Sequence, residues 1–247
     1  MKPPTPLVVA GMHRSGTSLA AALLGGRGLD LGQSSPAGPV DDRAQGFEDR
    51  GFLALNRRLV ADVCDTDLPG YPEWGWTENG RFDAAGLAAR ADEGRRLLED
   101  LGAHRGHRGF VDPRGTLLLD YWDGLFEEAR YVLVYRNPWD VADSMQRLGT
   151  EVFLRRPDYA AKMWSFYNRR LLDFYRRQEG RCALVSARAL AERPEEVVEV
   201  VTRKLGLELG AASVPDAVDG RRLRGVPFGD PWPRLFAATY PGILDDL

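Results

Sequence analysis

The chain has 247 residues, of which 44% are hydrophobic and 28% charged, as is typical of a globular protein rather than a disordered or fibrous one. Its formal net charge of −3 argues against a non-specific nucleic-acid binder, and no apolar run approaches the roughly 18 residues that a membrane span requires. Two cysteines and three histidines are too few for a disulfide framework or a metal cluster, and the first apolar run is too short for a secretory signal, so we expect a cytoplasmic, metal-free protein.

The first third of the chain predicts a strand, two helices and two loops. Residues 7–10 form an apolar run closed by a glycine, and a helix rich in alanine and leucine is predicted over 17–24. Residues 26–48 are rich in glycine, proline and aspartate and predict a long loop. Apolar residues then recur at steps of three and four over 50–63, which indicates an amphipathic helix, and a second loop follows over 66–82.

The remainder alternates short apolar runs with helical patterns. The predicted elements are a helix over 84–101, a strand over 109–112, a short helix over 115–123, a strand over 131–135, helices over 138–148 and 159–177, a strand over 182–185 and a helix over 194–205. Strands separated by helices favour a parallel sheet. We therefore predict a single α/β domain over 1–247 with a central P-loop-like parallel sheet flanked by helices. Its core spans 7–205, and an irregular proline-rich wrap covers 213–247.

A glycine-containing turn, GMHRSGTS over residues 11–18, lies between the first strand and its helix. Backbone N–H groups in such a turn and the positive end of the helix together form an anion site. The spacing is close to G-x-x-x-x-G-K-[ST], but Thr17 stands where nucleoside triphosphatases place their lysine. The alternative is a tight strand-to-helix turn whose polar residues are incidental.

A second motif, RNPWDVADS, begins at Arg136 where the third predicted strand ends. Asn137 and Pro138 are typical of the start of a helix, which then presents Ser144. The guanidinium of Arg136 offers a fork of donors to a phosphate, and Ser144 adds a neutral donor. Alternatively, Arg136 pairs with a surface carboxylate and Asn137 only caps the helix.

Both segments, in this order and about 120 residues apart, resemble the sulfotransferase family, which uses 3′-phosphoadenosine 5′-phosphosulfate (PAPS). The first is similar to the 5′-phosphosulfate loop of bacterial members, which often reads GMHRSGTS, and the second to the family pattern R-N-P-x-D-V-x-x-S. The resemblance covers roughly 7–205. It implies a PAPS-dependent enzyme that moves a sulfuryl group to a hydroxyl, or as a second choice an amine, of a small-molecule acceptor and releases 3′-phosphoadenosine 5′-phosphate (PAP).

The resemblance also implies which residues bind the nucleotide. Arg14 would act at the transferring group, while Thr17 and Ser18 would hydrogen-bond the 5′-phosphate. Arg136 and Ser144 would bind the 3′-phosphate. The full implied set is Arg14, Ser15, Gly16, Thr17, Ser18, Arg136, Ser144, Arg224 and Gly225, of which the last two only faintly resemble the family's C-terminal basic-glycine contact.

Sulfuryl transfer needs a general base and cations but no metal, because arginine side chains and backbone dipoles can supply the electrostatics. Residues 111–114 resemble the K-D-P-R segment of bacterial members with Val111 in place of the lysine, so Arg114 would supply that charge. Other branches of the family use a glutamate after the first helix, and Glu48 is therefore the first candidate for the base. Asp112, which could instead hold Arg114, and His13, which could instead donate to the sulfate, remain alternatives.

Two other functions are compatible with parts of the pattern. A P-loop kinase of a small metabolite would share the phosphate loop but lacks its lysine, and a non-catalytic nucleotide-binding protein would share both motifs. A loop holding Tyr71, Trp74 and Trp76 would either form an apolar wall for the acceptor or anchor the loop to the core.

Overall fold

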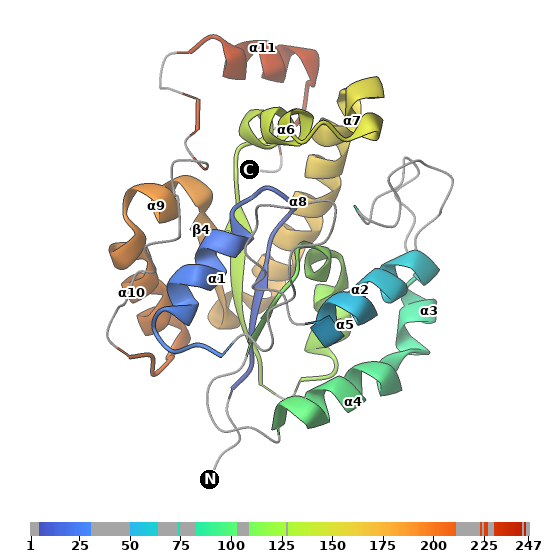
Figure 1. Ribbon diagram of the computed structural model, residues 1–247, viewed down its shortest axis with the longest axis vertical. Coiled ribbons are helices and arrows are strands. Elements are labelled where there is room, and N and C mark those ends of the chain that lie inside the picture. The colour runs from blue at the N-terminus through green and yellow to red at the C-terminus, as the bar shows by residue number, and fades with distance from the viewer. Residues whose placement is uncertain are drawn as a thin grey trace.

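A parallel four-stranded sheet forms the centre of the molecule. The computed structural model describes residues 5–30, 50–63, 74, 83–102, 109–126, 128–210, 223, 225–226, 230–243 and 245. The strands are β1 (Leu7–Ala10), β2 (Gly109–Val111), β3 (Arg130–Tyr135) and β4 (Cys182–Ser186), in the order β2-β1-β3-β4 (Figure 1). Val8 pairs with Phe110 on one side and with Tyr131 on the other. The predicted parallel α/β fold is confirmed.

Alternating strand residues bury their side chains on opposite faces of the sheet. Val9 and Val132 face a cluster built with α1 (Thr17–Gly25), α9 (Ala187–Glu192) and α10 (Pro194–Leu205). Val8 and Tyr131 face a larger cluster on the other side. The helices contributing to that cluster include α2 (Arg50–Val63), α5 (Leu119–Asp123), α6 (Pro138–Arg147) and α8 (Asp158–Gln178). Both faces are therefore covered, which explains why the strands read as continuous apolar runs.

One predicted helix is two helices in the structure. The predicted 84–101 helix is divided into α3 (Ala84–Ala88) and α4 (Ala91–Gly102). At the break, the carbonyl of Arg90 accepts a hydrogen bond of 2.8 Å from the hydroxyl of Tyr121. That tertiary contact is not encoded in the local periodicity, so the pattern predicted one continuous element.

Short elements were also missed. A 3-10 turn over Pro113–Leu118 (η1) precedes α5, where one short helix over 115–123 was predicted. Two short helices, α7 (Glu151–Arg155) and α9, lie between predicted elements, and a 3-10 turn over Glu179–Arg181 leads into β4. Segments of five or six residues are too short to establish a helical period.

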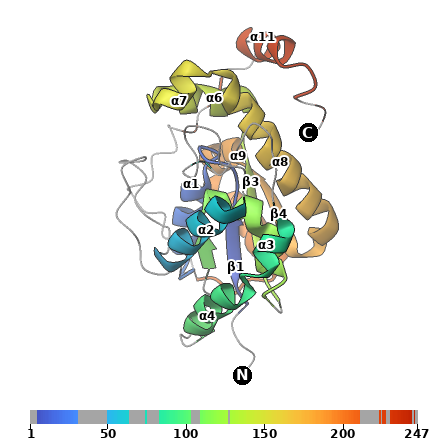
Figure 2. The ribbon, with the colours of Figure 1, turned by 90° about the vertical axis from the view of Figure 1, so that its right-hand side faces the viewer.

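The tail predicted to be irregular contains a helix, α11 (Trp232–Thr239), which packs on α6 and buries Phe236. Prolines at the start of this helix suggested irregular chain, although proline is well suited to the first helical positions. In Figures 1 and 2, α6, α7 and α11 lie at the top of the molecule, the end toward which the strands run.

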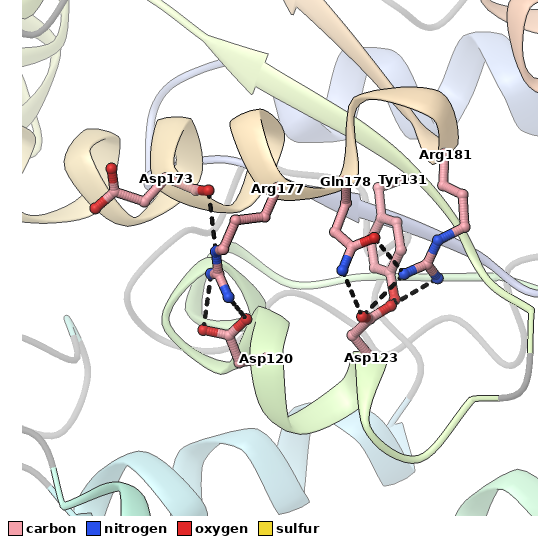
Figure 3. Close-up of polar contacts among 7 residues, drawn as sticks. All are labelled: Asp120, Asp123, Tyr131, Asp173, Arg177, Gln178 and Arg181. Carbon is pink, nitrogen blue, oxygen red and sulfur yellow. Dashed lines mark hydrogen bonds and ion pairs between the residues drawn. The ribbon is translucent and has the colours of Figure 1, made fainter.

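At the C-terminal end of α8, charged side chains connect that helix to α5 (Figure 3). Asp123 accepts hydrogen bonds from Arg181 at 2.9 Å, from the hydroxyl of Tyr131 at 2.7 Å and from Gln178 at 3.3 Å. Its neighbour Asp120 pairs with Arg177 at 2.9 Å in a more exposed position. Asp123 thus fixes the starts of β3 and β4 relative to α5, while Asp120 connects α5 to α8.

Candidate functional site

The connection from β1 to α1 passes very close to β3. A Cβ added at Gly11 would collide with the carbonyl oxygen of Val134, so only glycine fits at the end of β1. The amide of Gly11 donates to Oγ1 of Thr116 at 2.8 Å. Two further residues turn the chain: Arg14 has a φ of 67° and Gly16 a φ of 96°. A non-glycine residue in this left-handed region is uncommon, and such backbone clusters at functional sites.

The start of α1 has the features of an anion site. Gly16 precedes the helix without any side-chain cap, and its first turn contains no acidic residue. The first backbone N–H groups of a helix lack partners within it, and the helix dipole is positive at that end. Thr17 and Ser18 are the first two helical residues, so their backbone amides belong to this set.

The second motif lies directly beside this loop. The side chain of Arg14 donates from Nε to Oγ of Ser144 at 3.0 Å, and Arg136 donates from a terminal nitrogen to the carbonyl oxygen of Arg14 at 3.0 Å. The carbonyl of Arg136 in turn accepts a hydrogen bond of 2.8 Å from the indole of Trp164. The two motifs are thus joined at the carboxyl ends of β1 and β3, where the strand order reverses and ligands bind in open α/β sheets.

Several polar atoms here are buried and have no hydrogen-bond partner within the described residues: Nε2 of His13, Oγ of Ser15 and Nε of Arg136. Burial lowers the pKa of Arg136, and the charge of Arg14 adds to that shift while Asp140 opposes it. Unpaired buried donors carry a cost in free energy, which an anion at this position would remove.

His13 lies against aromatic rings. Its ring centroid is 4.9 Å from that of Trp74, edge to face, and the hydroxyl of Tyr167 donates to the Trp74 carbonyl at 2.6 Å. Burial, with contributions from Arg114 and Arg14, holds the pKa of His13 well below its usual value. The imidazole is therefore neutral at neutral pH, and it is a hydrogen-bonding group rather than a strong base.

Asp112 and Arg114 form a buried polar unit after β2. One carboxylate oxygen of Asp112 accepts from Nδ2 of Asn56 at 2.9 Å, and the other accepts from the Arg114 amide at 2.9 Å. Asn56 also accepts from the indole of Trp122 at 3.0 Å. Asp112 is fully buried and Arg114 is 7% exposed. The carboxylate thus anchors α2 and the turn that carries Arg114.

Comparison with known proteins decides the family. The model of the sulfotransferase family matches residues 6–210. The chain belongs to the sulfotransferase family. A search of curated protein sequences finds no significant match.

Solved sulfotransferase structures share the fold at low sequence identity. The sulfotransferase domain of the Synechococcus PCC 7002 olefin synthase is 22% identical, with a TM-score of 0.55 over 90% of this chain and 80% of that one. The sulfotransferase domain from the curacin biosynthetic pathway is 16% identical, with a TM-score of 0.57 over 92% and 82%. A sulfotransferase from Mycobacterium avium is 16% identical, with a TM-score of 0.55 over 98% and 69%.

The structure places most of the predicted site residues of this sulfotransferase in one region. The loop residues 13–18, Arg136 and Ser144 surround the junction of β1 and β3, and Gly225 lies beside α6. Glu48 and Arg224 lie outside the described residues, as do Tyr71 and Trp76. Trp74 is 5% exposed and packs on Phe153 as well as on His13, as expected of a loop anchor.

Sequence reasoning missed two residues that support the site. Asn56 is a fully buried amide on the otherwise apolar stripe of α2. A polar residue on the apolar face of a predicted helix can be seen in the sequence and indicates a buried hydrogen bond. Trp164 was counted only as part of an apolar period, although a buried indole N–H needs an acceptor. Its acceptor, the carbonyl of Arg136, lies at the site itself.

Two features are absent from the part of the chain that the structure describes. No group of three or more His, Cys, Asp or Glu side chains is placed there to hold a metal ion. None of the helices in that part of the chain is long and apolar enough to cross a membrane.

Proposed function

We propose that this sulfotransferase takes its sulfuryl group from PAPS and transfers it to a hydroxyl of a small molecule, with an amine as the second choice of acceptor. The contact between Arg14 and Ser144 carries the proposal. It brings together two motifs that the sequence separates by about 120 residues. A nucleotide with phosphates at both its 5′ and 3′ positions matches two adjacent anion-binding elements.

The residues present fit such a nucleotide. The uncapped start of α1, with Ser15, Thr17 and Ser18, would hold the 5′-phosphate. Arg136 and Ser144 would hold the 3′-phosphate, and Arg14, which contacts both of these residues, would lie between the two phosphates. When bound, PAPS supplies an activated sulfuryl group with PAP as the leaving group.

The side chains would stabilise charge and move one proton. Arg14 and Arg114 would offset negative charge on the sulfuryl oxygens and the leaving phosphate, which is the largest electrostatic demand of the reaction. Neutral His13 would contribute a hydrogen bond at the same position. Glu48 would accept the proton of the acceptor hydroxyl, because both Asp112 oxygens already accept hydrogen bonds in a site that is closed to solvent.

Calorimetry with two nucleotides tests the proposal. PAP should bind much more tightly than adenosine 5′-monophosphate, and Arg136→Ala should remove about 1.5–3 kcal/mol of PAP binding, as loss of a charge-assisted hydrogen bond would. The exposed Arg147→Ala, on the same helix as Ser144, is the matched control. Equal affinities for the two nucleotides in the wild type would contradict the 3′-phosphate assignment.

A metal test separates this function from the kinase alternative. Turnover with PAPS should survive excess EDTA, because arginines supply the charge here. Turnover that is lost in EDTA and restored only by Mg²⁺ with a nucleoside triphosphate would favour a kinase.

A further inference from the structure

Asp140, in the first turn of α6, is a buried carboxylate whose contacts reach a distant part of the chain. It is 5% exposed, and its Oδ1 accepts a hydrogen bond of 2.9 Å from the backbone amide of Val226. A Cβ added at Gly225 would lie 2.8 Å from its Oδ2, so glycine is needed for this approach. An acidic side chain at this helical position commonly caps its own helix, yet this one binds a backbone amide 86 residues away.

The same C-terminal segment, defined here as Leu223, Gly225 and Val226, also contacts the phosphate loop. A Cβ added at Gly16 would lie 2.9 Å from Cδ1 of Leu223. Gly16 immediately precedes α1, whose amino end forms the proposed 5′-phosphate site. The segment therefore lies against both motifs at once, through Gly16 on one side and Asp140 on the other.

Asp140 lies close to the proposed 3′-phosphate site as well. It follows Arg136 by four residues, and the Asn137 side chain donates to its Oδ2 at 3.4 Å. Its negative charge favours the cationic form of Arg136, which burial and Arg14 disfavour. A single carboxylate thus contacts the turn that carries Arg136 and the segment that crosses the loop.

We propose that Asp140 is a positioning residue that holds the C-terminal segment across the nucleotide site. It thereby keeps the nucleotide-binding groups in their bound arrangement before the nucleotide binds. The identity of the ligand in this inference rests on the proposed function, whereas the contact between Asp140 and Val226 is independent of it. Holding a segment in its bound arrangement raises affinity because less conformational freedom is lost on binding. The acceptor is not involved, so its binding should be independent of Asp140.

Four variants of the full chain separate the roles of this side chain. Asp140→Ala removes the acceptor for the Val226 amide, whereas Asp140→Asn keeps a carbonyl oxygen in the same place. Gly225→Ala pushes the segment away from an intact Asp140. Asp143→Ala removes a half-exposed carboxylate from the same helix, where it forms an ion pair with Arg147, and serves as the matched control.

The first measurement is hydrogen exchange of the Val226 amide in the free protein. Asp140→Ala and Gly225→Ala should raise its exchange rate about tenfold, the equivalent of one hydrogen bond, while Asp140→Asn should stay within about threefold of the wild type. The second is kinetic. The KM for PAPS and the Kd for PAP should rise about tenfold in the first two variants, with the KM for the acceptor unchanged and partial rescue by asparagine.

Each contrary result has a distinct meaning. Unchanged Val226 exchange or unchanged PAP affinity in Asp140→Ala, with wild-type binding intact, would overturn the inference alone. Equal rises in the KM values for donor and acceptor would also overturn it, because they indicate a general structural role. Failure of the wild type to bind PAP would instead overturn the proposed function, together with the nucleotide role of Asp140.

Discussion

Buried polar atoms at the junction of β1 and β3 are the feature that most clearly distinguishes the site at the level of single residues. Ser15 and Arg136 each bury a polar side-chain atom that has no partner within the described residues. By contrast, both carboxylate oxygens of Asp112 accept hydrogen bonds. Buried polar groups without partners are rare in folded proteins, so the unpaired ones at this junction are the groups that a bound ligand would satisfy.

The neutral imidazole of His13 predicts a pH dependence of stability. Its pKa in the folded protein lies well below 6.5, so below pH 6.5 the unfolded chain binds a proton that the folded chain does not. Stability should therefore fall as the pH drops from 7 to 5.5, by up to about 1.4 kcal/mol per pH unit from this group. Urea unfolding of the wild type and His13→Gln checks this. Parallel slopes in the two proteins would contradict the assignment.

The choice of base predicts opposite outcomes for two carboxylates. Glu48→Gln keeps size and hydrogen bonding but loses the basic oxygen, so turnover should fall about 10²–10⁴-fold with PAP affinity unchanged. Asp112→Asn should lower the melting temperature, because both oxygens of the wild-type carboxylate accept buried hydrogen bonds. Normal turnover in the glutamate variant with collapse in a stably folded Asp112→Asn would make Asp112 the base. Normal turnover in both would favour His13.

At the level of helices and strands, the elements that the sequence predicts correctly are those whose signal lies in the local pattern of apolar residues. The predicted strands lie within a residue of β1–β4, and the amphipathic helix over 50–63 matches α2. The prediction of one continuous helix over 84–101 was wrong, because the chain breaks between α3 and α4, where the Arg90 carbonyl accepts a hydrogen bond from a side chain of α5. The contact of Gly225 with Asp140 was equally invisible, since it joins residues with no periodic relation.

Two neighbouring acids of α5 test how burial sets the strength of an ion pair. Asp123→Ala should destabilise the protein by about 2 kcal/mol, because it removes a mostly buried carboxylate that accepts hydrogen bonds from Arg181, Tyr131 and Gln178 (Figure 3). Asp120→Ala removes an exposed pair and should cost less than about 1 kcal/mol. Chemical denaturation of both variants measures the difference. Equal losses would mean that solvent screening does not separate the two pairs.

At the scale of the whole molecule, the candidate site is assembled from segments that span most of the chain. The loop after β1, the turn after β3 and the C-terminal segment meet at one end of the sheet, with α6 beside them (Figures 1 and 2). A ligand that contacts all of these segments binds only the folded chain. Its binding energy is then added to the stability of the entire domain.

PAP should accordingly raise the melting temperature. At a free concentration 100 times its Kd, it should add about 2.7 kcal/mol to the free energy of unfolding, or roughly 5–10 °C for a domain of this size. Adenosine 5′-monophosphate at the same concentration should add less, since it lacks the group assigned to Arg136 and Ser144. Differential scanning calorimetry with each nucleotide makes the comparison. Equal shifts would contradict the assignment.

The backbone pairing of β1 with β3 sets the distance between the two motifs that would bind the nucleotide. Leu7 pairs with Arg130 and Ala10 with Leu133, and this register fixes how far the loop after β1 lies from Arg136. A slip of one residue would shift the two motifs by about 3.3 Å and turn every side chain of the strand to the opposite face. The main-chain hydrogen bonds between β1 and β3 therefore maintain the spacing between the two proposed phosphate positions. Side-chain substitutions can weaken the binding of either phosphate, whereas a change of strand register would alter the distance between them.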